Sequence, residues 1–196
     1  PTHLYREQLR VAENILVFLG LIGLVFSAET QSLTDPGSTN LTADSLAHCW
    51  RGGISPGDWQ LWGYESSKLL RENRKLAAVN AFASLWFRGS GARTSNFFRL
   101  TKKLVEVKND YKHDRGPTYP AEFEECVEEM GRDLRKCLEP LSFFVRYPIR
   151  LVEHMDRDWK TGKAVLDTLV YTGDHPGARQ ERLTLADALP EGKLYL

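Results

Sequence analysis

A short segment of the chain, EVKNDYKHDRGP at residues 106–117, gathers side chains that could handle a phosphate ester. They are three cations, one amide and one imidazole, namely Lys108, Lys112, Arg115, Asn109 and His113. The imidazole titrates near neutral pH and can move a proton, while ammonium and amide groups can hold phosphate oxygens. The segment therefore has the groups needed to bind and attack a phosphodiester.

The spacing of these residues decides which of them can meet on a helix. At about 100° per residue, Asn109 and His113 share one face, and Lys108 and Lys112 share the adjacent one. Lys108 and His113 are about 140° apart, so they meet only if the helix end unwinds or if two copies of the helix come together. Cations are also common at helix ends, because the negative end of the helix dipole favours them. The cluster is either half of a phosphate site or the solvated end of an ordinary helix.

The motif KNDYKHDRGP resembles the signature of the HEPN superfamily, which is Arg-Asn-x-x-x-His near a helix end, followed by a turn with glycine and proline. HEPN domains are helical. They include metal-independent ribonucleases of prokaryotic toxin–antitoxin, CRISPR and anti-phage systems, as well as inactive relatives. The resemblance covers roughly residues 5–155 and includes an N-terminal buried helix and the segment LSFFVRYPIRLVE after the motif's partner helix. Asn109 and His113 are in register with the motif.

The resemblance implies a mechanism that needs no metal and no cofactor. His113 would take the proton from a ribose 2′-hydroxyl, which attacks the neighbouring phosphate, while Lys108 and Asn109 hold its oxygens. Cleavage needs an acid as well as a base, and two motifs facing each other across a two-fold axis would supply both. The need for a 2′-hydroxyl makes the substrate RNA. The neighbouring residues expected to contact that RNA are Tyr111, Lys112 and Arg115.

Lysine at position 108, where the family has arginine, separates two hypotheses. Arginine offers a planar two-pronged donor to a phosphate, whereas lysine offers a point charge. An active motif predicts a homodimeric ribonuclease module, joined through the motif helices. It would be a toxin or effector of a larger prokaryotic defence or stress-response protein, with further domains or an antitoxin as partners. A degraded motif predicts an inactive HEPN-like module that dimerises, senses or binds RNA.

Composition excludes some alternatives. The 196 residues carry no formal net charge, so any contact with nucleic acid must come from a local patch. Three cysteines without a Cys-x-x-Cys pair indicate neither a disulfide framework nor a thiolate zinc site. We expect a cytoplasmic location. The chain starts without methionine and stops on GKLYL, so we expect a portion of a longer protein.

The most apolar run, ILVFLGLIGLVFSA at residues 15–28, is shorter than the roughly 18 to 20 residues that a membrane span needs. It belongs to a predicted helix over residues 3–29 with apolar positions nearly all round. We expect this helix to be buried on all sides and expect no membrane partner, with an interfacial or membrane segment as the alternative.

The remaining pattern predicts a mainly α fold, an antiparallel HEPN-like helical bundle over residues 1–147 with a small antiparallel β extension packed on it at 148–196. After the loop ETQSLTDPGSTN, LTADSLAHCW is a short helical candidate. A helix begins at Pro56 behind a Ser55 cap, and KLAAVNAFASLWF is the next. Thr94 or Ser95 caps the motif helix, which ends at HDRGP.

A partner helix opens at TYPAEF, and Pro140 should kink or break it. Two long helices joined by a short Gly-Pro turn predict an antiparallel pair. The β extension starts with a hairpin whose turn is KTGK, and ARQERLTL and GKLYL are further strands.

Three other polar segments are interpreted as structural. The glutamates of EFEECVEEMGRD form a solvated helix face, because a carboxylate-bridged metal site would need a nearby histidine. RGSGARTS lacks the Gly-Lys-Ser/Thr of a phosphate loop. TGDHPG, with Asp174 and His175, is interpreted as a turn.

Overall fold

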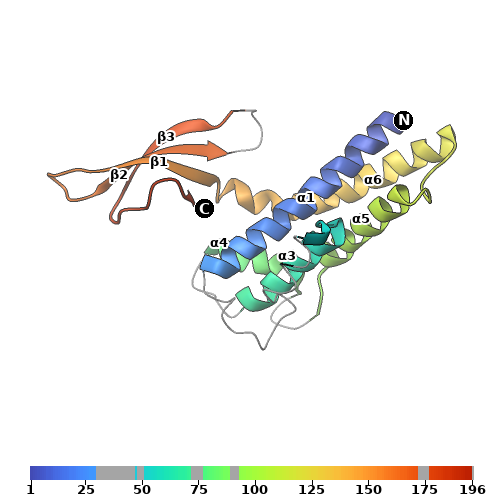
Figure 1. The fold of residues 1–196 in the computed structure, drawn as a ribbon, viewed down its shortest axis with the longest axis horizontal. Helices are drawn as coiled ribbons and strands as arrows, with labels where there is room; N and C mark the ends of the chain where they lie inside the picture. Colours follow the sequence, from blue (N-terminus) through green and yellow to red (C-terminus); the bar gives the residue numbers. More distant parts are fainter. Residues whose placement is uncertain (30–46, 48–50, 72–76, 89–92, 172–176, 196) are drawn as a thin grey trace. The chain divides into compact units, whose positions relative to one another are not determined.

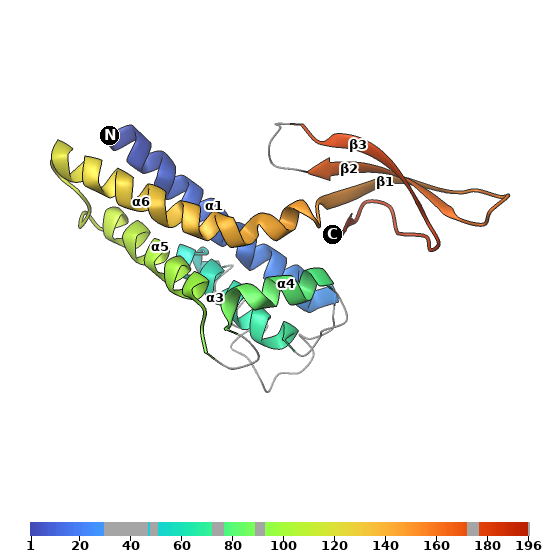
Figure 2. The same cartoon turned by 180° about the vertical axis from the view of Figure 1, so that it is seen from behind.

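The computed structural model describes residues 1–29, 47, 51–71, 77–88, 93–171 and 177–195. These residues are mainly helical, with a small antiparallel sheet at the C-terminal end, which confirms the predicted fold class at that level (Figures 1 and 2). Contacts divide the chain into two compact units, Pro1–Leu141 and Ser142–Leu196, whereas the predicted boundary is at residue 147.

The first unit is helical. Its described helices are α1 (Thr2–Glu29), α3 (Pro56–Leu70), α4 (Ala77–Trp86), α5 (Asn96–Lys112) and α6 (Pro120–Leu141). Helix α1 contacts α3, α5 and α6, and α4 contacts α3 and α5. Both views show α5 and α6 side by side and antiparallel, joined by a short turn (Figures 1 and 2). The predicted helix pair is confirmed.

Local capping signals explain where two of these helices begin. The Ser55 hydroxyl accepts from the backbone N–H of Asp58 at 3.2 Å, and the Asp58 carboxylate accepts from the backbone N–H of Ser55 at 2.7 Å. This is a complete capping box, with Pro56 as the first helical residue. Ser95 caps α5, since its hydroxyl accepts from the backbone N–H of Phe98 at 3.1 Å. Of the two predicted caps for α5, the structure uses Ser95.

Helix α1 is not buried on all sides, so that prediction is wrong. One face is buried against α3, α5 and α6, but Leu4, Val11, Leu21 and Val25 remain 42–53% exposed. Its neighbours cover only part of its circumference. Among the described helices, α1 alone is long and apolar enough to span a membrane, and half of its most apolar window is buried within the protein. Core helices and signal sequences pass the same test.

Helix α6 ends where its proline predicts. Pro140 lies in the last turn, the helix stops at Leu141, and a short 3₁₀ turn, Ser142–Val145, follows. Its buried apolar residues form a stripe along one side of the helix, namely Phe123, Met130, Leu134 and Cys137. The stripe therefore faces the core of the helical unit, and the glutamates on the opposite side are exposed.

The second unit is a four-stranded antiparallel sheet in the order β3-β2-β1-β4. Its strands are β1 (Ile149–Arg157), β2 (Ala164–Tyr171), β3 (Arg179–Leu185) and β4 (Leu194–Tyr195). The predicted hairpin turn at KTGK joins β1 to β2, with Gly162 at a positive φ of 70°. A bulge in β1, between Val152 and His154, interrupts its pairing with β2. The small buried core of the sheet consists of Val152, Ala164 and Leu166.

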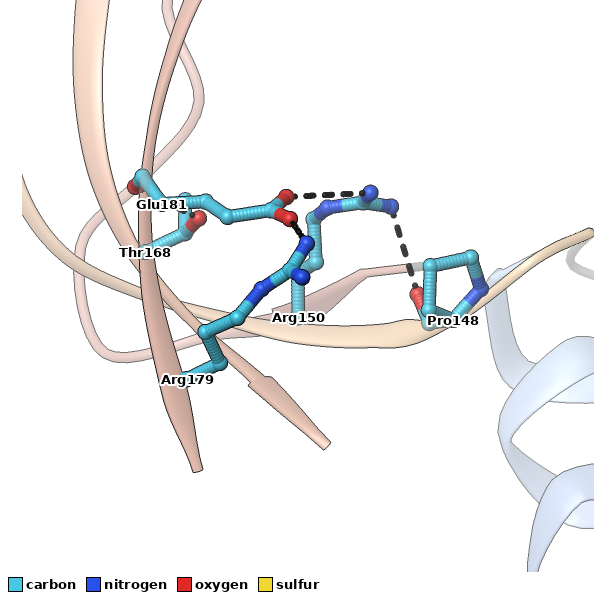
Figure 3. Close-up of polar contacts among 5 residues, drawn as sticks. All are labelled: Pro148, Arg150, Thr168, Arg179 and Glu181. Atoms are coloured by element: carbon cyan, nitrogen blue, oxygen red, sulfur yellow. Dashed lines mark hydrogen bonds and ion pairs between the residues drawn. The ribbon is translucent and has the colours of Figure 1, made fainter. Parts of the chain in front are cut away.

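Charged residues continue the core-side face of this sheet beyond the apolar cluster. Figure 3 shows Arg150 and Arg179 both directed at the carboxylate of Glu181. Arg150 Nη2 lies 3.5 Å from that carboxylate, and the Thr168 hydroxyl donates to the Glu181 carbonyl at 3.0 Å. The Arg179 guanidinium, with Arg150 beside it, lowers the pKa of Glu181. The group ties β1, β2 and β3 together.

Four predictions fall wholly or partly outside the described residues. They are the loop ETQSLTDPGSTN, the short helix at LTADSLAHCW, the loop RGSGARTS and the turn TGDHPG.

Candidate functional site

The candidate site lies at the C-terminal end of α5. The helix stays regular through Lys112, and His113 forms its C-cap, donating its backbone N–H to the Asn109 carbonyl at 3.0 Å. The helix end therefore does not unwind in a way that brings Lys108 to His113. Of the two routes by which those side chains could meet, a second copy of the helix is the one left.

The turn after α5 folds back tightly onto the helix. Asp114 adopts a positive φ of 55°, and the backbone N–H of Arg115 donates to the Asp110 carbonyl at 2.8 Å. The Arg115 guanidinium also pairs with the Asp110 carboxylate at 3.0 Å. A Cβ at Gly116 would lie 2.9 Å from the Tyr111 ring, so this position needs glycine for close approach. The turn holds the end of the motif in a fixed shape.

Lys108 faces inward. It continues the buried stripe of Phe97, Thr101 and Leu104, and its side chain is only 22% exposed. Its ammonium lies 2.6 Å from the carboxylate of Glu13 on α1. In a single copy of the chain, the cation at the family's arginine position is thus already paired.

Tyr111 links the motif helix to α1. Its hydroxyl accepts from Arg6 Nε at 2.8 Å, across 105 residues of sequence. Its ring makes an edge-on contact with Tyr5, with centroids 5.6 Å apart, and Tyr5 in turn packs edge-on against Phe123. Burial raises the pKa of Tyr5 to about 12. Tyr111 is therefore held in the interface between α1, α5 and α6.

The remaining motif residues face solvent. Lys112 and His113 are exposed, and Asn109 is half-buried beside them. Asn109 lies one turn before His113, and the side chains of Lys108 and Tyr111 contact α1. Arg115 is exposed in the turn, paired with Asp110.

Glu13 and Arg6 contact motif residues, although neither is part of the motif. Both belong to α1, about a hundred residues before the motif, and nothing in the local pattern of α1 marks them. The periodicity of α1 shows which of its positions are polar, but it does not show which helix those side chains contact.

A second polar cluster lies in the same helical interface. Lys103 pairs with Glu129 and lies 2.6 Å from Asp133, whose side chain is 11% exposed. The hydrogen bonds that the Lys103 ammonium donates to Asp133 and Glu129 raise the pKa of Lys103, and the bond to Asp133 has the larger effect. The adjacent cavity of about 60 Å³ also borders Tyr5 and Cys126. It is far too small for a nucleotide, and the cluster is a structural ion pair.

A larger cavity of about 500 Å³ lies in the sheet unit. The residues that line it are Glu153, His154, Asp167, Thr168, Gln180, Glu181 and Arg182. Its main charges are already paired: Arg182 donates twice to Asp167, at 2.7 and 3.1 Å, and His154 Nδ1 lies 3.0 Å from Glu191. The hydrogen bond from Arg182 lowers the pKa of Asp167. With three carboxylates, one guanidinium and one histidine, the lining has an excess of acidic groups, which disfavours a phosphate ligand.

Comparison with known proteins leaves the family open. No family model matches the chain, and neither the curated proteins nor the solved structures compared with it include a match. The resemblance to HEPN domains therefore stays a prediction carried by residues 108–113 and the helix order.

Proposed function

We propose that this chain is a HEPN-type, metal-independent ribonuclease module that cleaves RNA at a composite site formed by two copies. It would serve as the effector part of a larger cytoplasmic defence or stress-response protein of a prokaryote. One observation carries the proposal: His113 is exposed at the C-terminal end of α5, next to the exposed Lys112 and one helical turn after the half-buried Asn109. An imidazole in that position is open to a substrate and to a second copy.

The chemistry follows from these groups. The imidazole of one His113 takes the proton of the ribose 2′-hydroxyl, and the 2′-oxygen attacks the adjacent phosphorus. The bond from phosphorus to the 5′-oxygen breaks, and the His113 of the second copy gives that oxygen a proton. The products are a 2′,3′-cyclic phosphate and a 5′-hydroxyl. Asn109 and the cations of the motif hold the non-bridging oxygens, where negative charge accumulates.

A second candidate function has its own supporting observation. Because the Lys108 ammonium is 2.6 Å from the Glu13 carboxylate, its charge is largely neutralised within the chain. A motif with a weakened cation fits a catalytically inactive module that dimerises, senses or binds RNA. We rank this second, since the geometry of Asn109 and His113 supports the catalytic role.

The test is cleavage of labelled RNA in the presence of a chelator. The parent chain is compared with His113→Ala and with His154→Ala, which removes an exposed histidine from the sheet unit. We expect chelator-resistant cleavage with cyclic-phosphate ends, lost in His113→Ala and kept in His154→Ala. Equal behaviour of the parent and His113→Ala would end the catalytic proposal, and RNA binding without cleavage would favour the inactive module.

A further inference from the structure

The tip of the β1–β2 hairpin presents a tryptophan to solvent. Trp159 is 84% exposed, whereas Trp62 and Trp86 are 4% and 0% exposed. Trp59 also packs, edge-on against Trp62 with ring centroids 4.8 Å apart. Leaving a whole indole in water forfeits the burial that favours large aromatic side chains inside proteins. Trp159 therefore contributes little to folding, and its exposed ring is available for contact with another molecule.

The turn that carries Trp159 is fixed by its own hydrogen bonds. The Asp158 carboxylate accepts from the Thr161 hydroxyl at 2.8 Å and from the backbone N–H of Lys160 at 2.9 Å. These two hydrogen bonds lower the pKa of Asp158, and the bond from Thr161 has the larger effect. The backbone N–H of Gly162 donates to the Asp158 carbonyl at 2.7 Å. The backbone that presents the indole is thus set before any partner arrives, which reduces the ordering cost of binding.

Three cations lie within four residues of Trp159 in the sequence. Arg157, Lys160 and Lys163 are all exposed, and the Lys160 ammonium lies 5.2 Å from the centroid of the Trp159 ring. The acidic residues at the tip have local roles: Asp158 organises the turn, and the Asp156 carboxylate accepts from the backbone N–H of Arg157 at 2.7 Å. The hairpin tip therefore combines one flat aromatic face with three basic side chains.

This combination selects among three kinds of partner. A protein hot spot needs surrounding contacts that exclude water, but the neighbours of Trp159 in the turn are charged or small. A membrane anchor gains from several apolar side chains, and Trp159 is the single large apolar residue from Arg157 to Lys163. Single-stranded nucleic acid needs what the tip has, an aromatic face for a base and cations for the flanking phosphates.

We propose that the hairpin tip, residues 157–163, is a binding element for single-stranded RNA, with a base stacked on Trp159 and neighbouring phosphates held by Lys160 and Lys163. The choice of RNA over DNA rests on the proposed function, since the 2′-hydroxyl chemistry of His113 requires it. The hairpin offers an aromatic side chain for base stacking, whereas Tyr111 of the motif helix packs against α1. Stacking of this kind accepts any base.

The test measures binding apart from cleavage, in the full chain carrying His113→Ala. A fluorescein-labelled polyuridine of about 12 nucleotides is titrated and its anisotropy recorded. We expect Trp159→Ala to weaken binding by about 5-fold to 150-fold, as loss of one stacked base does, and Trp159→Phe to keep most of the affinity. Tyr171→Ala, which removes a 46% exposed aromatic side chain at the other end of β2, serves as the control and should leave the affinity unchanged.

Other outcomes decide against the hairpin proposal or against the proposed function. Equal affinity of the parent and Trp159→Ala overturns the proposal, as does an equal loss in Tyr171→Ala. The proposal is also overturned if the chain binds phosphatidylserine vesicles through Trp159 and does not bind polyuridine. If the histidine-intact chain does not cleave RNA but binding still depends on Trp159, the proposed function fails and the hairpin proposal stands. If the histidine-intact chain cleaves RNA but binding does not depend on Trp159, the proposed function stands and the hairpin proposal fails.

Discussion

At the scale of single residues, the pairing of Lys108 with Glu13 is the feature on which the two candidate functions differ. The ammonium is held by a carboxylate from another helix, so a phosphate must compete with Glu13 for it. Both side chains are partly exposed, and such pairs contribute little to stability. The pair is thus better understood as a restraint on Lys108 than as a support of the fold.

Glu13→Gln should therefore release Lys108 for phosphate at little cost to folding. In the His113→Ala chain, we expect tighter binding of single-stranded RNA and a steeper salt dependence, because one more cation contacts the backbone. The free energy of unfolding should fall by less than about 1 kcal/mol. Anisotropy titrations at several salt concentrations measure the first effect, and urea unfolding measures the second.

The matched control for that experiment is Glu7→Gln, which removes a carboxylate of the same helix that pairs with Arg10 instead. It changes the net charge by the same amount. An equal gain in RNA affinity in both variants would mean that only overall charge matters and that Lys108 has no special access to RNA.

Two buried groups make the helical unit sensitive to alkali. Burial, with a smaller contribution from Asp133, raises the pKa of the Cys137 thiol from 9.0 to about 12, and burial raises that of Tyr5 from 10.0 to about 12. Because the pKa is higher in the folded state, the unfolded chain loses these protons first. The stabilisation is complete below about pH 9 and is lost as pH rises toward about 12, by up to about 1.4 kcal/mol per pH unit for each group.

Urea unfolding followed by far-UV circular dichroism between about pH 8 and pH 11 checks this loss. Cys137→Ala should reduce the part that begins near pH 9 and keep the part that begins near pH 10, where Tyr5 titrates in the unfolded chain. An unchanged pH profile in Cys137→Ala would show that the thiol does not contribute.

At the scale of elements, close packing of α1 on α3 depends on glycines. A Cβ at Gly20 would lie 2.7 Å from the Trp59 ring and 2.8 Å from the Trp59 carbonyl oxygen, and one at Gly23 would lie 2.9 Å from the Ser66 Cβ. The backbone contact cannot be relieved by a rotamer change. The two glycines thus let α1 approach α3 closely enough to bury one apolar face.

Gly20→Ala should destabilise the helical unit by about 1–3 kcal/mol, the usual cost of overpacking. Gly57→Ala is the control, because its added methyl group would meet only ordinary contacts at 3.6 Å or more, and alanine favours the helix. Thermal unfolding of the two variants compares them directly. Similar stability in Gly20→Ala and Gly57→Ala would show that α1 can shift away from α3 without penalty.

Helix boundaries were predictable because their signals are local. The Ser55–Asp58 box and the Ser95 cap each act across three residues, so the sequence around them contains the whole interaction. The burial of α1 was not predictable in the same way. An apolar circumference shows which faces can be buried, but the exposure of Leu21 depends on how many helices the rest of the chain supplies.

At the scale of the whole molecule, the candidate site shows the same limit. Helical geometry places Asn109 and His113 on one face, because four residues make slightly more than one turn. It cannot predict that Lys108 would meet Glu13, since that contact depends on how α1 packs against α5. It also leaves open the partner that completes the site, because a regular α5 keeps Lys108 and His113 about 140° apart around one helix.

If two copies complete the site, an inactive partner should abolish the activity of the copy it joins. Each site would need both His113 side chains, one as base and one as acid, so a mixed dimer with His113→Ala lacks one of them. Mixing equal amounts of parent and variant, with time for exchange, should leave about one quarter of the cleavage rate at constant total protein.

The control for the mixing experiment is His154→Ala, which should leave the rate nearly unchanged at any ratio, because this exposed histidine lies in the sheet unit. A rate that falls only to about one half with His113→Ala means that each copy cleaves alone. In that case a single copy of the chain would have to supply both the base and the acid. The end of α5 carries one imidazole, that of His113, so the acid would have to be another group of the same chain. The composite site would then be excluded.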